Sequence, residues 1–305
     1  MTAVVPFAEG EARLDWLGLV AALEAGHRLP RAQITDSFLY RGDDTLLNRA
    51  AWIDGLGLAV KSATIFPGNR AGGQPAINGG VSLYSDSDGT LQGIIDFHLV
   101  TKWKTAGDSL RGALMLARPD SKVILIVGAG TVAASLVQAY HAGFPGAAFL
   151  IWNRTSDRAQ DLAQKVCAQG IVAEAAPDLA AAVARADIVT CCTMSTDPVL
   201  CGDWLRPGQH IDLIGAYRPD MREVDDTALH RARIFVDSFD TTLDHIGELR
   251  IPLAAGTLSR DAVLADYYTP QAFVRAPDDI TLFKNGGGAH MDLMTSRYIL
   301  DCWQG

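Results

Sequence analysis

The pattern of hydrophobic and polar positions changes character near residue 118. Beyond that point, short apolar runs alternate with amphipathic stretches, as expected where the buried strands of a parallel sheet are joined by helices. The apolar runs predict strands at residues 123–127, 148–152, 171–173, 188–193, 210–214 and 234–237. The amphipathic stretches predict helices at residues 131–142, 156–169 and 179–185. This order indicates an α/β domain with a doubly wound parallel sheet of the Rossmann type over residues 119–289.

The part before residue 118 has a different pattern, in which helical stretches flank segments that alternate with a period of two. The expected elements are helices at residues 12–25 and 101–117 and antiparallel strands at residues 58–65, 80–85 and 91–96. A strand, a glycine turn and a helix are expected at residues 280–303, and residues 290–305 are expected to pack back on the first part. The sequence thus predicts an α+β domain formed by residues 1–118 with 290–305.

Composition and charge exclude several classes of protein. With 305 residues, 49% of them hydrophobic and 20% charged, the chain has the balance of a globular protein with room for two domains. A net charge of −9 provides no basic surface for nucleic acid or an anionic membrane. Glycines and a proline interrupt the uncharged stretch between Lys122 and Arg154, so we expect a strand, a helix and a strand there rather than a membrane span.

The N-terminal residues and the cysteines favour a cytoplasmic protein. Charged residues interrupt the start of the chain, which argues against a signal peptide. The five cysteines form no Cys-x-x-Cys pair and their number is odd, which favours reduced thiols. No cluster of His, Cys and Asp has the spacing of metal ligands, so we expect no bound metal.

A glycine-rich turn follows the first strand of the predicted parallel sheet. The segment Gly128-Ala-Gly-Thr-Val-Ala133 has the Gly-x-Gly-x-x-Ala spacing that places a dinucleotide pyrophosphate on a helix N-terminus. At the end of the next strand, an acidic residue would accept a hydrogen bond from the ribose 2′-OH of NAD. Asn153, Arg154 and Thr155 offer donors and a positive charge instead, which suit a 2′-phosphate. We therefore predict NADP(H) in preference to NAD(H). NAD(H) is the second choice, and a Rossmann-like fold that binds no nucleotide is the alternative.

One lysine is a candidate for acid–base chemistry. Lys61 is the only charged residue of the strand expected at 58–65, and alternation places it on the same face as Ala59 and Ala63. Burial there would lower the pKa of Lys61 and suit it to proton transfer near neutral pH. The pattern alone favours the alternative, a lysine on the solvent side of the strand.

Two further basic residues are candidates for anion binding. Arg31 offers a guanidinium that could hold a substrate carboxylate, although a surface arginine fits the pattern better. Lys104 and Thr105 lie near the expected start of a helix, where an anion is favoured, and an exposed basic turn is the alternative.

A series of collinear blocks links these candidates. The blocks are Val60-Lys-Ser-Ala-Thr-Ile-Phe-Pro-Gly-Asn69, residues 101–118, Ile126-Val-Gly-Ala-Gly130, Ile151-Trp-Asn-Arg-Thr155, Asp203-Trp-Leu-Arg-Pro-Gly208, Ile214-Gly-Ala-Tyr-Arg-Pro-Asp-Met-Arg-Glu-Val224 and Thr281-Leu-Phe-Lys-Asn-Gly286. Through them the chain resembles the ornithine cyclodeaminase/mu-crystallin family over nearly its whole length. The Trp-Asn-Arg-Thr and Arg-Pro-Asp-x-Arg-Glu blocks look closest to the mu-crystallin branch, whose members bind NADPH and reduce cyclic ketimines.

The resemblance implies roles for individual residues. Lys61 matches the active-site lysine of the family, and Arg31 matches an arginine that binds the substrate carboxylate. The residues implied to bind the cofactor are Thr105, Gly128, Gly130, Thr131, Val132, Asn153, Arg154, Thr155, Thr193, Met194, Asn285 and Gly286.

The chain departs from the family pattern at two substrate-binding positions. Lys104 stands where the family usually has an arginine, which keeps the charge but loses the bidentate geometry toward a carboxylate. Tyr217 stands where cyclodeaminases have an acidic catalytic residue, and a tyrosine cannot act as a carboxylate at neutral pH.

The resemblance and these departures favour one function among three. We expect an NADP(H)-dependent reductase of a small ketimine or imino acid, or the reverse dehydrogenation of an amino acid, in the cytoplasm. The resemblance also implies that the α+β domain binds the substrate and forms a homodimer. Ornithine cyclodeaminase, a lyase that recycles its NAD internally, is the first alternative. A protein that binds NADPH and a ligand without catalysis is the second alternative. The sequence does not discriminate among substrates.

Overall fold

The computed structural model describes residues 2–305, apart from the side chain of Arg70. The chain forms two compact units. The first contains the chain up to Lys104 together with Gly287–Gly305, and the second contains Thr105–Gly286. The boundary expected at residue 118 therefore lies later than the observed one. The C-terminal segment joins the first unit from Gly287 rather than from residue 290.

The first unit is built on a six-stranded sheet with the order β1-β6-β5-β4-β3-β2. Its strands are β1 (Ala3–Val5), β2 (Gln33–Arg41), β3 (Asp44–Ile53), β4 (Gly57–Ile65), β5 (Ile77–Tyr84) and β6 (Leu91–Asp96). Its helices are α1 (Phe7–Glu11), α2 (Trp16–His27), the first part of α3 (Phe97–Leu116) and α10 (Ala289–Gln304). The strands pair in antiparallel fashion except for β1, which runs parallel to β6. The expected antiparallel strands are present, and β2 and β3 extend the sheet beyond them.

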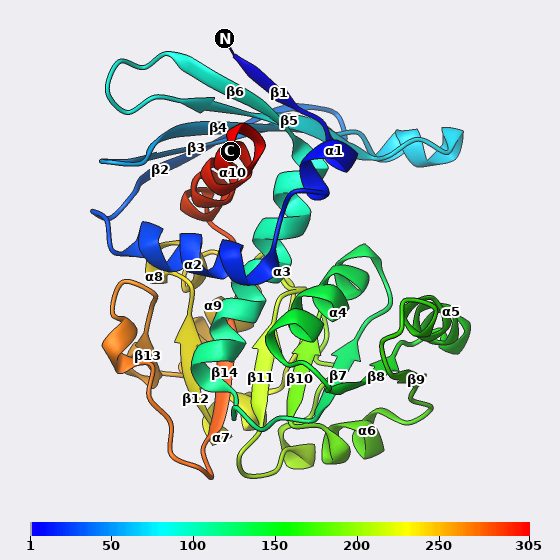
Figure 1. The fold of residues 1–305 in the computed structure, drawn as a ribbon. Coiled ribbons are helices and arrows are strands. Elements are labelled where there is room, and N and C mark those ends of the chain that lie inside the picture. The colour runs from blue at the N-terminus through cyan, green and yellow to red at the C-terminus, as the bar shows by residue number, and fades with distance from the viewer. Residues whose placement is uncertain (1) are drawn as a thin grey trace. The chain divides into compact units, whose positions relative to one another are not determined.

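Helix α10 covers one face of this sheet and packs on β3 and β4 (Figure 1, red). The burial of β4 alternates residue by residue, so that Ala59, Lys61 and Ala63 lie on the buried face. The alternation in the sequence therefore placed Lys61 correctly beside the two alanines. The alternative of a solvent-facing lysine is wrong.

The second unit is built on an eight-stranded parallel sheet with the order β13-β12-β14-β11-β10-β7-β8-β9. Its strands are β7 (Val123–Val127), β8 (Ala148–Trp152), β9 (Ala173–Ala175), β10 (Ile188–Cys191), β11 (His210–Leu213), β12 (Ala232–Val236), β13 (Val263–Ala265) and β14 (Ile280–Lys284). Its helices are the second part of α3, α4 (Thr131–Gly143), α5 (Ser156–Cys167), α6 (Leu179–Arg185), α7 (Asp226–Arg231), α8 (Phe239–Thr242) and α9 (Gly247–Ala255). The doubly wound parallel sheet is confirmed, and β9 lies two residues later than the predicted strand at 171–173.

Strand β7 lies inside this sheet, between β10 and β8, and it is apolar throughout. Its residues Ile124–Val127 are fully buried, and each such side chain contributes about 1.5–3 kcal/mol through its removal from water. Helix α4 packs on β7 through small residues, among them the fully buried Ala133. The alanine that ends the Gly-x-Gly-x-x-Ala motif thus allows the helix to approach the sheet closely.

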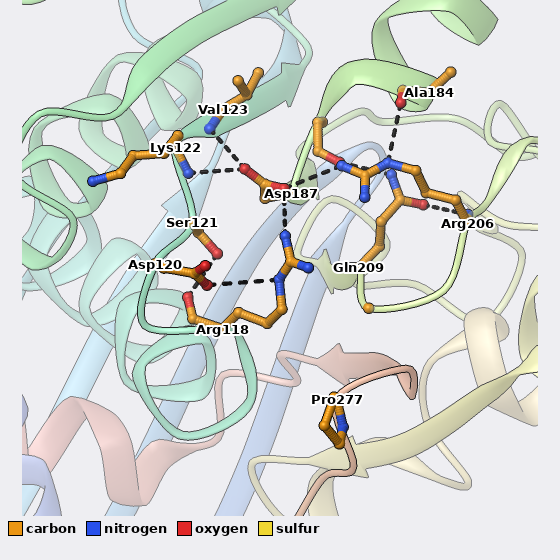
Figure 2. A network of polar contacts seen from close by, with 12 residues as sticks. Arg118, Asp120, Ser121, Lys122, Val123, Ala184, Asp187, Arg206, Gln209 and Pro277 are labelled. Carbon is orange, nitrogen blue, oxygen red and sulfur yellow. Dashed lines mark hydrogen bonds and ion pairs between the residues drawn. The ribbon is translucent and has the colours of Figure 1, made fainter.

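A polar network fixes the amino end of β7 (Figure 2). The Asp187 carboxylate, at the start of β10, accepts hydrogen bonds from the backbone N–H groups of Lys122 and Val123 at 2.8 and 3.1 Å. It also pairs with Arg118 at 2.9 Å and with Arg206 at 3.1 Å. Burial opposes ionisation, but these donors hold the pKa of Asp187 below its usual value. The network joins β7 to β10 at the edge of the sheet opposite to the glycine-rich turn.

The long uncharged stretch of the sequence does not form a membrane-spanning helix. Among the helices of residues 2–305, none is both long and apolar enough to cross a membrane. The uncharged stretch between Lys122 and Arg154 forms β7, α4 and β8, as the sequence predicted. The five cysteines of the described chain are free thiols.

Candidate active site

A buried ion pair lies between the sheet and α10 in the first unit. The ammonium of Lys61 donates to Asp292 Oδ1 at 2.9 Å, and the side chains are only 7% and 2% exposed. Lys61 comes from the centre of β4, and Asp292 comes from the first turn of α10. The ammonium also lies 4.7 Å from the centre of the Phe97 ring, which favours a cation. Two residues far apart in the sequence thus form one charged centre inside an apolar layer.

Two more cations surround the same carboxylate. The Nζ atom of Lys104 lies 3.8 Å from Asp292 Oδ1 and donates to the Gly287 carbonyl at 3.0 Å. Arg49, the cross-strand neighbour of Lys61, donates to the same carbonyl at 2.9 Å. Gly287 adopts a left-handed φ of 65°, which glycine tolerates best. We name Lys61, Lys104, Arg49 and Asp292 the lysine cluster. Its three cations exceed its one carboxylate, although Arg49 also pairs with Asp36 at 3.1 Å.

The protonation of the cluster follows from burial and from these charges. Burial lowers the pKa of Lys61 to about 8, while Asp292 opposes this shift and Lys104 adds to it. Burial opposes the ionisation of Asp292, but Lys104 and Lys61 hold the pKa of that carboxyl below its usual value. Near neutral pH the lysine is therefore mostly protonated, and its proton is easier to release than that of an ordinary lysine.

The glycine-rich turn in the second unit has the geometry that a dinucleotide requires. Gly128 has a left-handed φ of 129°, and a Cβ atom there would lie 2.8 Å from the Sγ atom of Cys192. Gly130 precedes the first turn of α4, and a Cβ there would meet no heavy atom within 4 Å. Thr131 and Val132 are exposed at the start of this helix, whose free N–H groups favour a phosphate. The residues present therefore fit a pyrophosphate.

The end of β8 supplies the groups expected near an adenosine ribose. Arg154 and Thr155 are exposed, and Asn153, half-buried, donates to the Thr155 carbonyl at 3.0 Å. A cavity of about 520 Å³ extends from the glycine-rich turn to α5. It is lined by Ala129, Gly130, Thr131, Ala134, Arg158, Asp161, Leu162 and Lys165. Arg158 and Lys165 bring positive charge to this cavity and Asp161 brings a carboxylate, whereas residues 153–155 are not part of its lining.

Most of the other predicted residues lie in loops, and one belongs to the lysine cluster. Arg31 is exposed in the loop between α2 and β2, and Tyr217 is 58% exposed in the loop after β11. Met194 is exposed after β10, beside the half-buried Thr193. Lys104 is the predicted substrate residue that the structure brings into the lysine cluster.

The residues at the end of β14 are held within the second unit. Asn285 is buried and donates to the Thr105 carbonyl at 3.2 Å. Gly286 packs so closely on Thr242 that a Cβ would lie 2.3 Å from its hydroxyl oxygen.

The expected anion site at a helix start near Lys104 and Thr105 is wrong. Helix α3 begins at Phe97, so both residues lie beyond its first turn. The helix dipole acts mainly within the first and last turns. Lys104 lies beside the Asp292 carboxylate because its ammonium reaches into the lysine cluster. Its place in the helix does not explain this contact.

Sequence reasoning missed Arg49 and Asp292. The only signal for Asp292 was a carboxylate inside the apolar run Ala289-His-Met-Asp-Leu-Met294, where an unpaired charge would be costly. Arg49 stands opposite Lys61 through the β3–β4 register, and β3 itself was not predicted. Within the described residues, no three His, Cys, Asp or Glu side chains come close enough to hold a metal ion.

Comparisons with known proteins relate the chain to one family. The model of the ornithine cyclodeaminase/mu-crystallin family matches residues 52–305. The Delta(1)-pyrroline-2-carboxylate reductase of Paracoccus denitrificans is 51% identical over 300 residues, which cover 96% of this chain and 94% of the relative. The ketimine reductase mu-crystallin of Mus musculus is 31% identical over 246 residues, or 81% of this chain and 76% of the relative.

Solved structures share the fold. The Thermococcus litoralis Delta(1)-pyrroline-2-carboxylate reductase, in complex with NADH and L-proline, aligns with a TM-score of 0.90 at 22% identity over 99% of this chain and 98% of its own. A probable ornithine cyclodeaminase from Bordetella pertussis aligns with a TM-score of 0.88 at 27% identity over 99% of this chain and 97% of its own.

Proposed function

The chain belongs to the ornithine cyclodeaminase/mu-crystallin family, and from this premise we propose that it is an NADP(H)-dependent reductase of a cyclic imino acid. The substrate carries a C=N bond next to a carboxylate. The relative with 51% identity is a Delta(1)-pyrroline-2-carboxylate reductase, so we place that imino acid first among the substrates.

The observation that carries the proposal is the buried pair of Lys61 and Asp292 with Lys104 and Arg49 around it. An imino acid offers one anionic group and one basic nitrogen. Lys104 and Arg49 would hold the carboxylate, which would compete with the Gly287 carbonyl for both side chains and with the Asp36 carboxylate for Arg49. The ammonium of Lys61 would then lie opposite the imine nitrogen and donate a proton to it.

The chemistry divides between the cofactor and the lysine cluster. When bound, reduced nicotinamide supplies the hydride that the imine carbon accepts. Lys61 supplies the proton that the imine nitrogen gains, so that C=N becomes CH–NH, and it regains a proton from water. A pKa of about 8 suits this exchange, because the ammonium is the major form at pH 7 and is still a workable acid. Asp292 keeps Lys61 oriented and charged.

The proposed preference for NADP(H) rests on the residues at the end of β8. No carboxylate stands at positions 153–155, where recognition of the NAD ribose needs an acceptor. Arg154 instead offers a planar guanidinium that binds phosphate well. Together with Gly128 and Gly130 at the pyrophosphate turn, it forms the proposed cofactor site.

The lyase alternative requires an acid that the chain lacks at the matching position. The exposed Tyr217 carries a phenol there in place of a carboxylate. A cyclodeaminase would also release ammonia from ornithine with no net change in its nicotinamide. Incubation with ornithine, a catalytic amount of NAD and an ammonia assay separates this reaction from imine reduction.

A panel of imino acids tests the proposed function. The protein is mixed with NADPH or NADH and with pyrroline and piperideine carboxylates, and the nicotinamide absorbance is followed. We expect oxidation of NADPH with at least one cyclic imino acid. Cofactor binding without oxidation for every member would favour a non-catalytic binding protein and refute the reductase.

Asp292→Asn should move the alkaline limb of the pH–rate profile to lower pH. The charge and the hydrogen bond of Asp292 both raise the pKa of Lys61, so their loss lets burial lower it further. Lys61 then loses its proton at a lower pH, and the rate falls where the wild type is still active. Breaking the buried pair should also cost about 3 kcal/mol of unfolding free energy.

The pH dependence of kcat/KM, with thermal melting beside it, measures both effects. Asp15→Asn is the matched control, because Asp15 caps α2 through the Gly18 N–H and is not among the groups that set the pKa of Lys61. An unchanged alkaline limb in Asp292→Asn would contradict the role given to this pair.

We also propose a homodimer. The edge strand β2 carries Phe38, Leu39 and Tyr40, which are 48, 65 and 72% exposed. A cavity of about 440 Å³ nearby is lined largely by apolar residues of β2, β3 and β4. An apolar edge of this kind is usually covered by another chain. Sedimentation should give twice the chain mass, and Leu39→Lys should shift the protein toward monomer.

A further inference from the structure

The order of the strands in the second unit marks one place at the carboxyl edge of its sheet. From β7 the chain runs outward through β8 and β9, then crosses back to β10 on the other side of β7. Ligands of doubly wound sheets bind at such a switch point. The loops that begin there are the glycine-rich turn after β7 and the segment 192–197 after β10. A dinucleotide lying across the switch point meets the second loop with its nicotinamide half.

The loop after β10 is packed tightly on both sides. Its first residue, Cys192, donates its backbone N–H to the Val127 carbonyl at 2.9 Å and stands against Gly128. On the other side, a Cβ atom on Gly215 would lie 1.8 Å from the carbonyl oxygen of Thr193. The loops after β10 and β11 therefore touch through their backbones.

One side chain holds both loops. Glu223 Oε1 accepts hydrogen bonds from the backbone N–H and the hydroxyl of Thr193 at 2.7 and 2.8 Å. Glu223 Oε2 accepts from the backbone N–H groups of Gly215 and Ala216 at 2.7 and 3.3 Å. Four donors from two loops thus converge on one fully buried carboxyl. Because each oxygen serves a different loop, the carboxyl fixes the distance between them.

Glu223 is itself held in place by the backbone around it. The side chain of Glu248, from α9, accepts the N–H groups of Glu223 and Val224 at 2.8 and 3.1 Å. The carbonyl of Glu223 accepts the N–H groups of Val199 and Leu200, both at 2.9 Å. The carboxyl therefore acts from a fixed support, as expected for a residue that positions others.

The charges around Glu223 show that its placement is costly. Burial and the neighbouring Glu248 raise the pKa of Glu223 to about 8, whereas Lys284 and the Thr193 donors lower it. Lys284 is fully buried as well and donates to the carbonyls of Leu213 and Asn285 at 2.9 and 2.7 Å. If this space only had to be packed, apolar residues would fill it at a lower cost in folding free energy.

We propose that Glu223 is a positioning residue for the nicotinamide half of the cofactor, which it orders by holding the loops after β10 and β11 together. The inference rests on the proposed binding of a nicotinamide dinucleotide. It assigns Glu223 no contact with the cofactor, because its oxygens are occupied by the loop donors.

Glu223→Gln tests the inference, since it keeps the shape of the side chain but replaces one acceptor oxygen with a donor. At least one loop then loses its partner. The Kd for NADPH should rise about tenfold, as expected for the loss of about one hydrogen bond. The Kd for 2′,5′-ADP, which lacks the nicotinamide half, should stay within about twofold of wild type.

Asp187→Asn is the matched control, because Asp187 is another carboxylate of this unit with several hydrogen bonds, but at the opposite edge of the sheet (Figure 2). It should lower the melting temperature and leave both Kd values unchanged. A merely structural Glu223 would behave in the same way. Thus a lower melting temperature in Glu223→Gln with an unchanged Kd for NADPH overturns the inference.

Thr193 provides a second test that holds even if Glu223→Gln does not fold. Thr193→Val removes the hydroxyl donor to Glu223 and keeps the shape, whereas Thr193→Ser restores the donor. We expect weaker binding of NADPH but not of 2′,5′-ADP in the valine variant, and wild-type binding in the serine variant. Equal binding by all three proteins overturns the inference. If the wild type binds neither NADPH nor NADH, the proposed function itself fails.

Discussion

Lys61→Met should lower kcat for imine reduction about a thousandfold. A positioned acid contributes roughly 10²–10⁴ in rate, and the imine nitrogen must gain its proton as the carbon gains hydride. Methionine fills a similar space beside Ala59 and Ala63 but carries no proton. Asp292 would be left without its nearest cation, so the unfolding free energy should also fall by about 3 kcal/mol. Steady-state kinetics with NADPH and a cyclic imino acid give the rate.

Lys102→Met is the control for this variant. Lys102 lies on α3 near Lys104 but forms an ion pair with Glu11, outside the lysine cluster. It should keep its rate within about twofold of wild type, as surface ion pairs have small effects. The Kd for NADPH should be unchanged in Lys61→Met, because the residues proposed to bind the cofactor lie in the other unit. Imine reduction at the full rate in this variant would remove Lys61 from the mechanism.

Arg154→Ala should weaken NADPH binding about thirtyfold and leave NADH binding nearly unchanged. A guanidinium bound to a phosphate contributes about 2 kcal/mol through charge-assisted hydrogen bonds, and about 2 kcal/mol corresponds to this change in Kd. NADH has no 2′-phosphate, so its binding free energy should not change. Fluorescence titration with both nucleotides measures the ratio of the two Kd values.

Arg185→Ala is the control for the second experiment, because Arg185 is exposed in the same unit but pairs with Glu174 on the rim of the sheet. It removes the same charge and should not change the ratio. If Arg154→Ala weakened NADPH and NADH equally, the arginine would contribute to general binding only. The proposed preference for NADP(H) would then be wrong.

The sequence predicted the second unit well because its strands are buried on both faces. Parallel strands of this kind are continuous apolar runs, and Val123–Val127 and Ala148–Trp152 have the predicted bounds. Helices α4 and α6 end at Gly143 and Arg185, close to the predicted ends, whereas α5 ends at Cys167, two residues before the predicted end. The bounds of short strands near a surface are harder to predict, and the strand β9 was predicted two residues too early.

The first unit was predicted less completely because its strands do not alternate cleanly. Strand β2 exposes Phe38, Leu39 and Tyr40 in succession, so no period of two appears there. The hairpin of β2 and β3 was missed, and Arg49 was missed with it. In β4, by contrast, one face is buried by α10, and the alternation around Lys61 is visible in the sequence.

The lysine cluster could be only half predicted, since its members meet through tertiary packing. Lys61 and Asp292 are 231 residues apart in the sequence, and only the packing of α10 on β4 brings them together. The resemblance to a known family singled out Lys61. It gave no reason to choose Asp292, because an acidic residue in the first turn of a helix is common on the surface as well.

The central claim is net reduction of an imine, and the stoichiometry of the reaction measures it most directly. NADPH and Delta(1)-pyrroline-2-carboxylate are supplied to the wild-type protein, and the NADPH consumed is compared with the proline formed. Hydride transfer to the imine carbon predicts one NADPH oxidised for each proline. Proline formed from ornithine with release of ammonia and no net loss of nicotinamide absorbance would contradict the account.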